Sequence, residues 1–244
     1  MAIALFYDIH GNLPALQAAF AAARSAGATE FVIGGDVVPG PMPNECLALL
    51  ATLTPAPVCI SGNGEREVLN LRSGGVAPKL PAAVIESLRW TADALEPQHA
   101  EWIASWPATL SRDGVFYCHA TPGSDTRLFT RLTPDADVEP LFAGVREPLA
   151  VCGHTHMQFD RKIANLRIVN PGSVGMPFGA AGACWALLQA PGHVQLRRTG
   201  YDLVAAAERV RASAYPDAEV FAERSILHPP SEADMLAAFS AVPA

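Results

Sequence analysis

The sequence predicts an α/β protein built around a largely parallel sheet, and three observations support this. The chain has 244 residues, enough for one sizeable domain. Hydrophobic residues make up 50% of it and charged residues 17%, so the chain can bury a core. Short apolar runs of strand length alternate with amphipathic stretches of helical length, which is the pattern of successive β-α-β units.

The beginning of the chain carries this alternation most clearly. Met1 to Tyr7 is an unbroken apolar run, as expected for a strand that is buried on both faces. A helix is predicted over Leu13 to Ala26, because apolar residues recur there at helical spacing. The pattern then predicts a strand, a helix and a strand in turn over Glu30 to Ile33, Asn44 to Leu53 and Val58 to Ile60.

The pattern changes after Asn63. Helices are predicted over Glu65 to Leu71 and on either side of Pro97, and this insert, about residues 65–107, is a candidate lid. From Asp202 onward the chain is alanine-rich and is also predicted to be helical. We therefore expect one domain over residues 1–200, with a helical tail over 201–244 packed on the same domain. Further strands are predicted between the insert and the tail, over Gly114 to Cys118, Leu149 to Cys152, Leu166 to Asn170, Ala183 to Leu188 and His193 to Arg198. The last of these indicate an antiparallel second sheet.

Charge and hydropathy exclude some functions. The formal net charge is -7, which argues against general binding of nucleic acid, because a basic surplus is needed to displace counterions. A small anionic substrate stays open, since bound metal ions reverse the local field. The sequence has no apolar run of membrane-spanning length and no leader pattern, so we expect a cytoplasmic protein without membrane contact. The oligomeric state is left open.

Side chains that bind metals follow the predicted strands, usually beside a glycine. Singly, each is more simply interpreted as a turn residue or a helix cap. The C-terminal ends of strands in an open α/β sheet meet at one crevice, however, so together these residues predict a metal site. Imidazole, carboxylate and amide ligands without thiolates suit Mn²⁺, Fe, Zn²⁺ or Ni²⁺. The candidate ligands are Asp8, His10, Asp36, Asn63, His119, His154 and His156.

The same segments resemble the calcineurin-like metallophosphoesterase superfamily, in order and in spacing. The flanking segments DIHGNLPAL and NPGSVG are similar to the small bacterial branch of YfcE-type phosphodiesterases. The resemblance runs from Met1 to about Leu188. Its five motifs are Asp8-Ile9-His10, Gly35-Asp36-Val37-Val38, Gly62-Asn63-Gly64-Glu65, His119-Ala120-Thr121-Pro122 and Gly153-His154-Thr155-His156.

The resemblance implies a two-sheet sandwich flanked by helices, in αββα layers, with residues 1–200 as the metallophosphoesterase domain. It also implies two divalent metal ions, bridged by the Asp36 carboxylate. One ion would be held by Asp8, His10, Asp36 and His156, and the other by Asp36, Asn63, His119 and His154. By the same resemblance, a water between the two ions would lose its proton near neutral pH and attack phosphorus in line. Asp36, Asn63 and His119 are the expected catalytic residues of this phosphoester hydrolase.

One position departs from the family pattern. Gly64 stands where the family motif GNH[DE] has a histidine, and that histidine resembles a group that contacts substrate and helps to protonate the leaving oxygen. Diesters and anhydrides with good leaving groups need less proton donation than alkyl monoesters. We therefore expect phosphodiesters or nucleotide-like phosphoanhydrides as small substrates. Candidate substrate contacts are Asn12, Gly64, Arg66 and Arg127, with Arg131 a further candidate.

Two other functions stay open at this point. One is a phosphomonoesterase, including a protein phosphatase, although Gly35 to Gly40 lacks the arginine of the pattern GDxxDRG. The other is a catalytically weak metal-binding scaffold, which loss of the motif histidine would permit. Retention of all seven candidate ligands argues against the scaffold.

Overall fold

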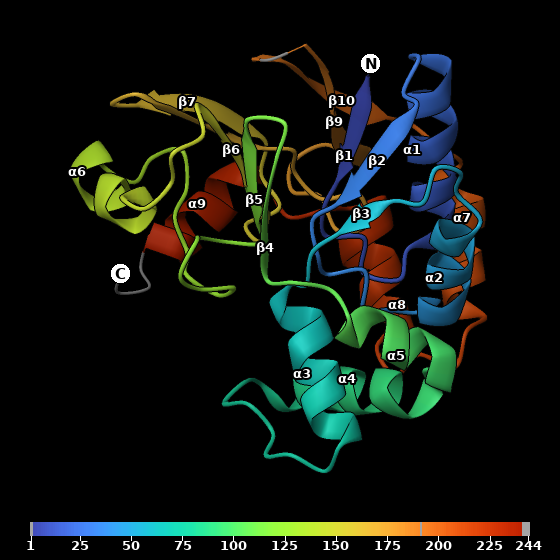
Figure 1. The fold of residues 1–244 in the computed structure, drawn as a ribbon. Coiled ribbons are helices and arrows are strands. Elements are labelled where there is room, and N and C mark those ends of the chain that lie inside the picture. Colours follow the sequence, from blue (N-terminus) through green and yellow to red (C-terminus); the bar gives the residue numbers. More distant parts are fainter. Residues whose placement is uncertain (1, 191, 241–244) are drawn as a thin grey trace.

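The computed structural model describes residues 2–190 and 192–240, and these form two five-stranded sheets with helices around them. Figure 1 shows α1 (Leu13–Ser25), α2 (Pro43–Ala51) and α7 (Leu203–Arg211) beside the first sheet, with α6 (Asp135–Val138) beyond the second. The αββα sandwich expected from the sequence is thereby confirmed.

The first sheet contains the predicted β-α-β units. Strands β1 (Ile3–Phe6), β2 (Glu30–Ile33) and β3 (Val58–Cys59) pair in parallel, with α1 and α2 as the connecting helices. Strand β1 is fully buried along its length, as its unbroken apolar run predicts. The order of this sheet is β10-β9-β1-β2-β3.

The prediction for the last two strands was wrong. Strands β9 (Ala183–Ala190) and β10 (His193–Thr199) do not belong to the second sheet but extend the first, with β9 antiparallel to β1. The physical reason is that β1 has a free edge on the side away from β2, and residues 183–188 of β9 are buried on both faces. A doubly buried strand fits a central position beside β1 better than an edge.

The second sheet has the order β4-β5-β6-β8-β7. Strands β5 (Val115–Cys118), β6 (Leu149–Val151) and β8 (Leu166–Asn170) are parallel. Strands β4 (Thr109–Arg112) and β7 (Phe159–Ile163) pair antiparallel at its two edges, and neither was predicted. Helix α6 continues into the 3₁₀ helix η1 (Glu139–Phe142), and its Val138 packs on the outer face of this sheet.

Alternation along β1 divides the core into layers. Ile3, Leu5 and Tyr7 face the second sheet, where they pack with residues of β5, β6 and β8. Ala4 and Phe6 face the helices on the other side. The Tyr7 hydroxyl donates a hydrogen bond to the Val151 carbonyl at 3.2 Å, so a polar contact also joins the two sheets.

The insert after β3 contains three helices: α3 (Asn63–Arg72), α4 (Ala82–Ala94) and α5 (Pro97–Ala104). The tail contains α7, α8 (Ala218–Phe221), the π-helix η2 (Ala222–Leu227) and α9 (Glu232–Ser240). Val210, Phe221 and Ile226 of the tail are buried in the same cluster as Phe6. The tail and the first sheet therefore share one hydrophobic core.

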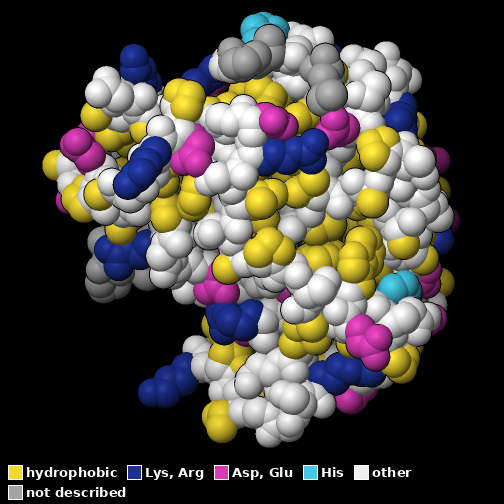
Figure 2. All heavy atoms as spheres, viewed as in Figure 1, with side chains coloured by type: hydrophobic (Ala, Val, Ile, Leu, Met, Phe, Trp, Pro, Cys, Tyr) yellow, Lys and Arg dark blue, Asp and Glu magenta, His cyan; other side chains and the backbone are white. Residues whose placement is uncertain are grey.

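The surface in Figure 2 has the same orientation as Figure 1 and is hollowed between α3 and the part that carries the second sheet. Basic and acidic side chains are interspersed on this face. Among the described residues, no helix has both the length and the apolar character to cross a membrane.

Candidate metal centre

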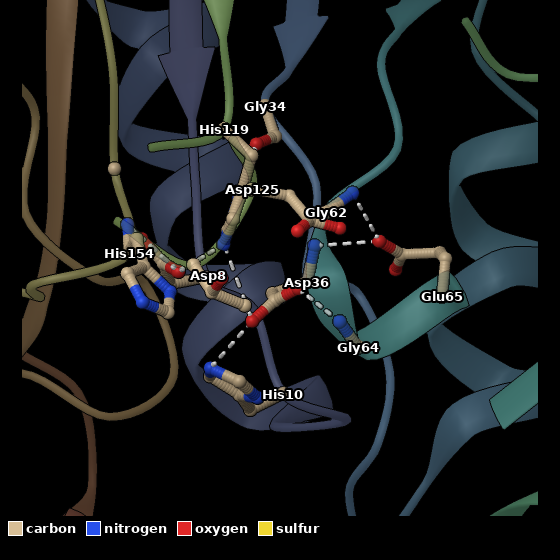
Figure 3. Close-up of polar contacts among 12 residues, drawn as sticks. Asp8, His10, Gly34, Asp36, Gly62, Gly64, Glu65, His119, Asp125 and His154 are labelled. Carbon is tan, nitrogen blue, oxygen red and sulfur yellow. Dashed lines mark hydrogen bonds and ion pairs between the residues drawn. The ribbon is translucent and has the colours of Figure 1, made fainter. Parts of the chain in front are cut away.

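The seven predicted ligands lie where strands of both sheets end. Asp8 and His10 follow β1, Asp36 follows β2, and Asn63 begins α3 directly after β3. From the second sheet, His119 follows β5, and the loop after β6 carries His154 and His156. Figure 3 shows Asp8, His10, Asp36, His119 and His154 close together.

Six of these side chains form two groups. Asp8, His10 and His156 make one, and Asp36, His119 and His154 make the other. Within each group the potential ligand atoms all lie within 4.8 Å of one another. The two groups divide these six side chains in the same way as the two implied ligand sets, and their binding of metal stays a prediction.

The Asp36 carboxylate lies between the groups. Its Oδ2 is 3.4 Å from His119 Nε2 in its own group and 3.8 Å from His10 Nε2 in the other. Its Oδ1 accepts a hydrogen bond from the Gly64 N–H at 2.7 Å. One oxygen is therefore anchored by the backbone, and the other faces both groups.

The backbone is strained at most of these ligands. Positive φ angles occur at Asp8 (54°), His10 (47°), Asp36 (51°), His154 (65°) and His156 (59°). Such angles are uncommon outside glycine and cost free energy unless the surroundings hold them. Hydrogen bonds from Asp8 N to the Gly35 carbonyl at 3.1 Å and from His10 N to the Asp36 carbonyl at 2.9 Å supply part of that support. Among the other described non-glycine residues, positive φ occurs only in two strand turns, at Asp113 and Ala164.

Two buried polar atoms of the centre have no partner within the described part of the protein. Asn63 Oδ1 and His119 Nε2 have no hydrogen-bond partner among the described residues. Leaving a buried polar atom unpaired costs about 1–3 kcal/mol, and both atoms are ligand atoms that a divalent ion would satisfy. Backbone carbonyls fix the other ring nitrogens: His119 Nδ1 is 2.9 Å from the Gly34 oxygen, and His156 Nδ1 is 2.8 Å from the Met176 oxygen. The residues present therefore fit a divalent metal.

The charges of the centre are already arranged for cation binding. Burial opposes ionisation of Asp36, yet His119 and then His10 hold its pKa below the ordinary value. Burial and the neighbouring His156 lower the pKa of His10 to about 4, and burial together with His119 lowers that of His154 to about 4. Burial also disfavours a charged His119, but Asp36 and Asp8 raise its pKa to about 10. His10 and His154 are thus neutral near neutral pH, as metal ligands must be, while His119 has to release a proton to bind an ion.

Glu65 supports the centre without belonging to either group. Its fully buried carboxylate accepts hydrogen bonds from Asp36 N at 2.8 Å, Val37 N at 2.7 Å and Val38 N at 3.2 Å. It also accepts one from Gly62 N at 2.8 Å. Burial and then Asp36 raise the pKa of Glu65 to about 7, and the backbone donors act against that rise. Glu65 therefore joins the loop that carries Asp36 to the loop that carries Asn63, a role that its place in the motif did not reveal.

The position of the missing family histidine is closed by the backbone. A Cβ atom at Gly64 would overlap the Val38 carbonyl oxygen and would lie 2.9 Å from both Asp36 Oδ1 and Pro39 Cδ. The carbonyl and Pro39 thus occupy the space into which a side chain would project. Glycine is required here by close approach, and the absent histidine has no vacant place.

Gly64→Ala is expected to destabilise the protein by about 3 kcal/mol, because the Val38 carbonyl cannot yield without moving Asp36. Urea denaturation of the metal-free variant measures the loss. Gly144→Ala is the control, since nothing lies within 4 Å of a Cβ atom at Gly144. Equal stability of the two variants would show that the loop around Val38 adapts freely.

The other predicted substrate contacts occupy varied positions. The buried Asn12 caps α1, accepting from Ala15 N at 3.2 Å and donating to the Gly175 carbonyl at 2.9 Å. The exposed Arg66 forms a two-bond ion pair with Asp125, at 2.5 and 3.1 Å. Arg127 is partly buried, and its Nε has no hydrogen-bond partner among the described residues. Arg131 pairs with Glu232 of α9 at 2.9 Å.

A cavity of about 510 Å³ adjoins the centre. Five predicted ligands reach it, whereas Asp8 and His119 do not line it. Of the predicted lid, only Val84 and Ser87 line it. Sequence reasoning missed the lining residues of the tail, because they form no motif and are far from the candidate ligands along the chain. They are Tyr215, Asp217, Val220, Phe221, Arg224, Ser225, Pro230 and Met235.

Known proteins share this architecture. An uncharacterized protein of Methanocaldococcus jannaschii is 27% identical over 239 residues, which covers 88% of this chain and 94% of that protein. A metallophosphoesterase from Sphaerobacter thermophilus is similar in structure with a TM-score of 0.73 at 22% identity, covering 93% of this chain and 100% of that one. A hypothetical protein from Pyrococcus horikoshii OT3 has a TM-score of 0.78 at 19% identity, covering 94% and 99% of the two chains.

A family model described as the calcineurin-like phosphoesterase superfamily domain matches residues 1–192. The matched segment contains all seven candidate ligands as well as both sheets up to β9. With its sandwich of two sheets and its two groups of candidate ligands at the strand ends, the chain belongs to the calcineurin-like phosphoesterase superfamily.

Proposed function

We propose that the protein is a dinuclear metal-dependent hydrolase of phosphodiesters or nucleotide-like phosphoanhydrides. The observation that carries this proposal is the pair of ligand groups with the Asp36 carboxylate between them. Asn63 Oδ1 and His119 Nε2 support it as well. Neither atom has a hydrogen-bond partner among the described residues, and both would serve as ligands of a second ion, together with Asp36 and His154. Two divalent ions supply Lewis acidity toward phosphoryl oxygens and lower the pKa of bound water.

The chain's own contribution is to position these groups before substrate binds. Asp36 has one oxygen held by the Gly64 N–H, so the other oxygen cannot rotate away from the two groups. His119 and His156 each have one ring nitrogen fixed by a backbone carbonyl, which directs the other nitrogen inward. The centre therefore needs little reorganisation when a phosphoryl group arrives.

The preference for diesters and anhydrides is supported by Gly64. With the Val38 carbonyl filling the place of a side chain, residue 64 offers only its N–H, and that N–H is already bonded to Asp36. A substrate with a good leaving group does not depend on a proton donor there. A small substrate fits the cavity better than a phosphoprotein, since the cavity that five of the predicted ligands line has a volume of only about 510 Å³.

The substrate ranking is the direct test of this proposal. With added Mn²⁺, kcat/KM for bis(p-nitrophenyl) phosphate is expected to exceed that for p-nitrophenyl phosphate by at least about tenfold. Both esters release the same nitrophenolate, so the comparison measures the preference for a diester over a monoester separately from any need to protonate the leaving group. Both rates are measured as nitrophenolate release, and elemental analysis of the purified protein identifies the bound metal. An Asp36→Asn preparation controls for contaminating host phosphatases.

Two other outcomes would contradict the proposal in different ways. A reversed ranking would indicate a phosphomonoesterase. Bound metal without turnover of any phosphoester would indicate a metal-binding scaffold.

A further inference from the structure

The cavity beside the metal centre has two unlike parts. One part is formed by ligands, including Asp36 and His154. The other part is largely apolar and includes Met176, Phe178 and Met235. A phosphoryl group held at the ligand side would project an ester substituent into the apolar side, because the two parts belong to one cavity.

The tail, which contributes much of the apolar part, is fixed at both ends. At its beginning, Tyr215 and Phe221 are buried in the main core, and Tyr215 packs edge-on against Trp90 of α4 with ring centroids 5.4 Å apart. Near its end, the Gly179 N–H donates to the Pro230 carbonyl at 2.8 Å, and Glu232 pairs with Arg131. The wall is therefore preformed and does not have to fold around a ligand.

A further contact joins the tail to the insert at the cavity. Ser87 of α4 donates a hydrogen bond to Asp217 at 3.3 Å, and both residues line the cavity. Two segments that are 130 residues apart in the chain thus meet at one side of it. The insert and the tail therefore both contribute to the apolar side of the cavity, together with Met176 and Phe178 from the segment between β8 and β9.

Exposed apolar side chains mark this part of the cavity. Val84 is 41% exposed and Val220 is 54% exposed, one from the insert and one from the tail, and both line the cavity. A ligand that covers exposed apolar side chains around a pocket removes apolar surface from water, and this burial favours binding.

Aromatic and sulfur-containing side chains specify the kind of group that fits. The Phe178 ring stacks on His156 with centroids 5.4 Å apart and planes inclined by 24°, so a flat surface begins directly at a metal ligand. Met176 and Met235 are flexible thioethers, which make favourable contacts with aromatic rings. Arg224 and Ser225 of the π-helix η2 add polar atoms to the same wall.

We propose that this apolar wall binds an aromatic substituent of the phosphoester substrate, of about the size of a nucleobase, and that the tail thereby selects the substrate. The inference rests on the proposed function, since it requires a phosphoryl group at the metal centre. An aliphatic lipid chain would bring no polar atom to Asp217, Arg224 and Ser225, whereas the polar edge of a base can meet them.

The test compares two phosphonates that cannot be hydrolysed. Methylphosphonate and (1-naphthylmethyl)phosphonate present the same headgroup to the Mn²⁺-loaded protein and differ in the aromatic substituent. Calorimetric titration is expected to show at least about tenfold tighter binding of the naphthyl compound, the range that stacking of one base provides. Val220→Asp is expected to remove most of this difference by placing a charge on the apolar wall.

Val204→Asp is the matched control for this variant. Val204 is also an exposed valine of the tail, at 63%, but it does not line the cavity, so its variant is expected to keep the wild-type affinity ratio. Equal affinities for the two phosphonates, no binding of either, or equal effects of the two valine variants would overturn the inference. Because these measurements do not depend on turnover, failure of hydrolysis in the nitrophenyl assay would overturn the proposed function separately.

Discussion

Asp36→Asn is expected to lower metal-dependent phosphoester hydrolysis at least about a thousandfold, because about 4 kcal/mol of transition-state stabilisation from the ions would be lost. The substitution keeps the shape of the side chain and an oxygen for the Gly64 N–H. It removes the negative charge that faces both ligand groups, at 3.4 Å from His119 Nε2 and 3.8 Å from His10 Nε2. Steady-state kinetics measures the loss of activity, and elemental analysis measures the metal content.

Metal should be lost from both groups in this variant, since one carboxylate serves both. Asp113→Asn is the matched control: Asp113 also has a positive φ, of 52°, but it lies in the turn between β4 and β5. Its variant is expected to keep full activity and full metal content. Unchanged metal stoichiometry in Asp36→Asn would refute the bridging role.

Glu65→Ala is expected to destabilise the protein by about 4 kcal/mol, even without metal, because the substitution leaves four buried N–H groups without an acceptor. Those groups belong to Gly62, Asp36, Val37 and Val38. Urea denaturation in the presence of EDTA isolates this effect from any loss of bound metal. The variant should also bind metal poorly, because the loops that carry Asp36 and Asn63 are no longer joined.

Glu86→Ala controls for the removal of a helical glutamate, since Glu86 is exposed on α4 and does not line the cavity. Its stability is expected to stay within about 0.5 kcal/mol of the wild type. A loss in Glu65→Ala that appears only in metal-loaded protein would mean that Glu65 acts through the ions and not through the backbone.

Local signals in the sequence account for the parts that were predicted well. The parallel units β1, β2 and β3 depend on apolar runs and on helices directly beside them, so short windows of sequence contain the information. The positions of the candidate ligands follow from the same local signals, because parallel strand ends converge.

Long-range pairing explains the features that were missed. Strand β9 could join either sheet according to its own residues, and only the free edge of β1 determines its partner. Strands β4 and β7 carry polar residues at sheet edges, as in Thr109–Arg112, so their hydrophobic signal is weak. The wall formed by the tail has no motif at all, since Val220 and Met235 acquire their role only through the position of the cavity.

The change at Gly64 shows a different limit. Sequence comparison identifies the missing histidine, but it cannot show that the Val38 carbonyl and Pro39 have taken up the space. The sequence shows the substitution at residue 64, whereas the residues that fill the vacated space, Val38 and Pro39, belong to a neighbouring loop. Restoring the family residue alone would therefore create a steric conflict and would not recover the family's arrangement.

Each ligand group draws on both sheets: Asp8 and His10 meet His156, and Asp36 meets His119 and His154. The nitrogens of His10 and His156 lie 3.1 Å apart, although 146 residues separate them in the chain. A metal ion in either group would thus act as a cross-link across the seam of the sandwich, closing a loop that includes most of the fold. Free energy of metal binding then adds to the free energy of folding, so the concentration of free metal would set the stability of the folded protein as well as its activity.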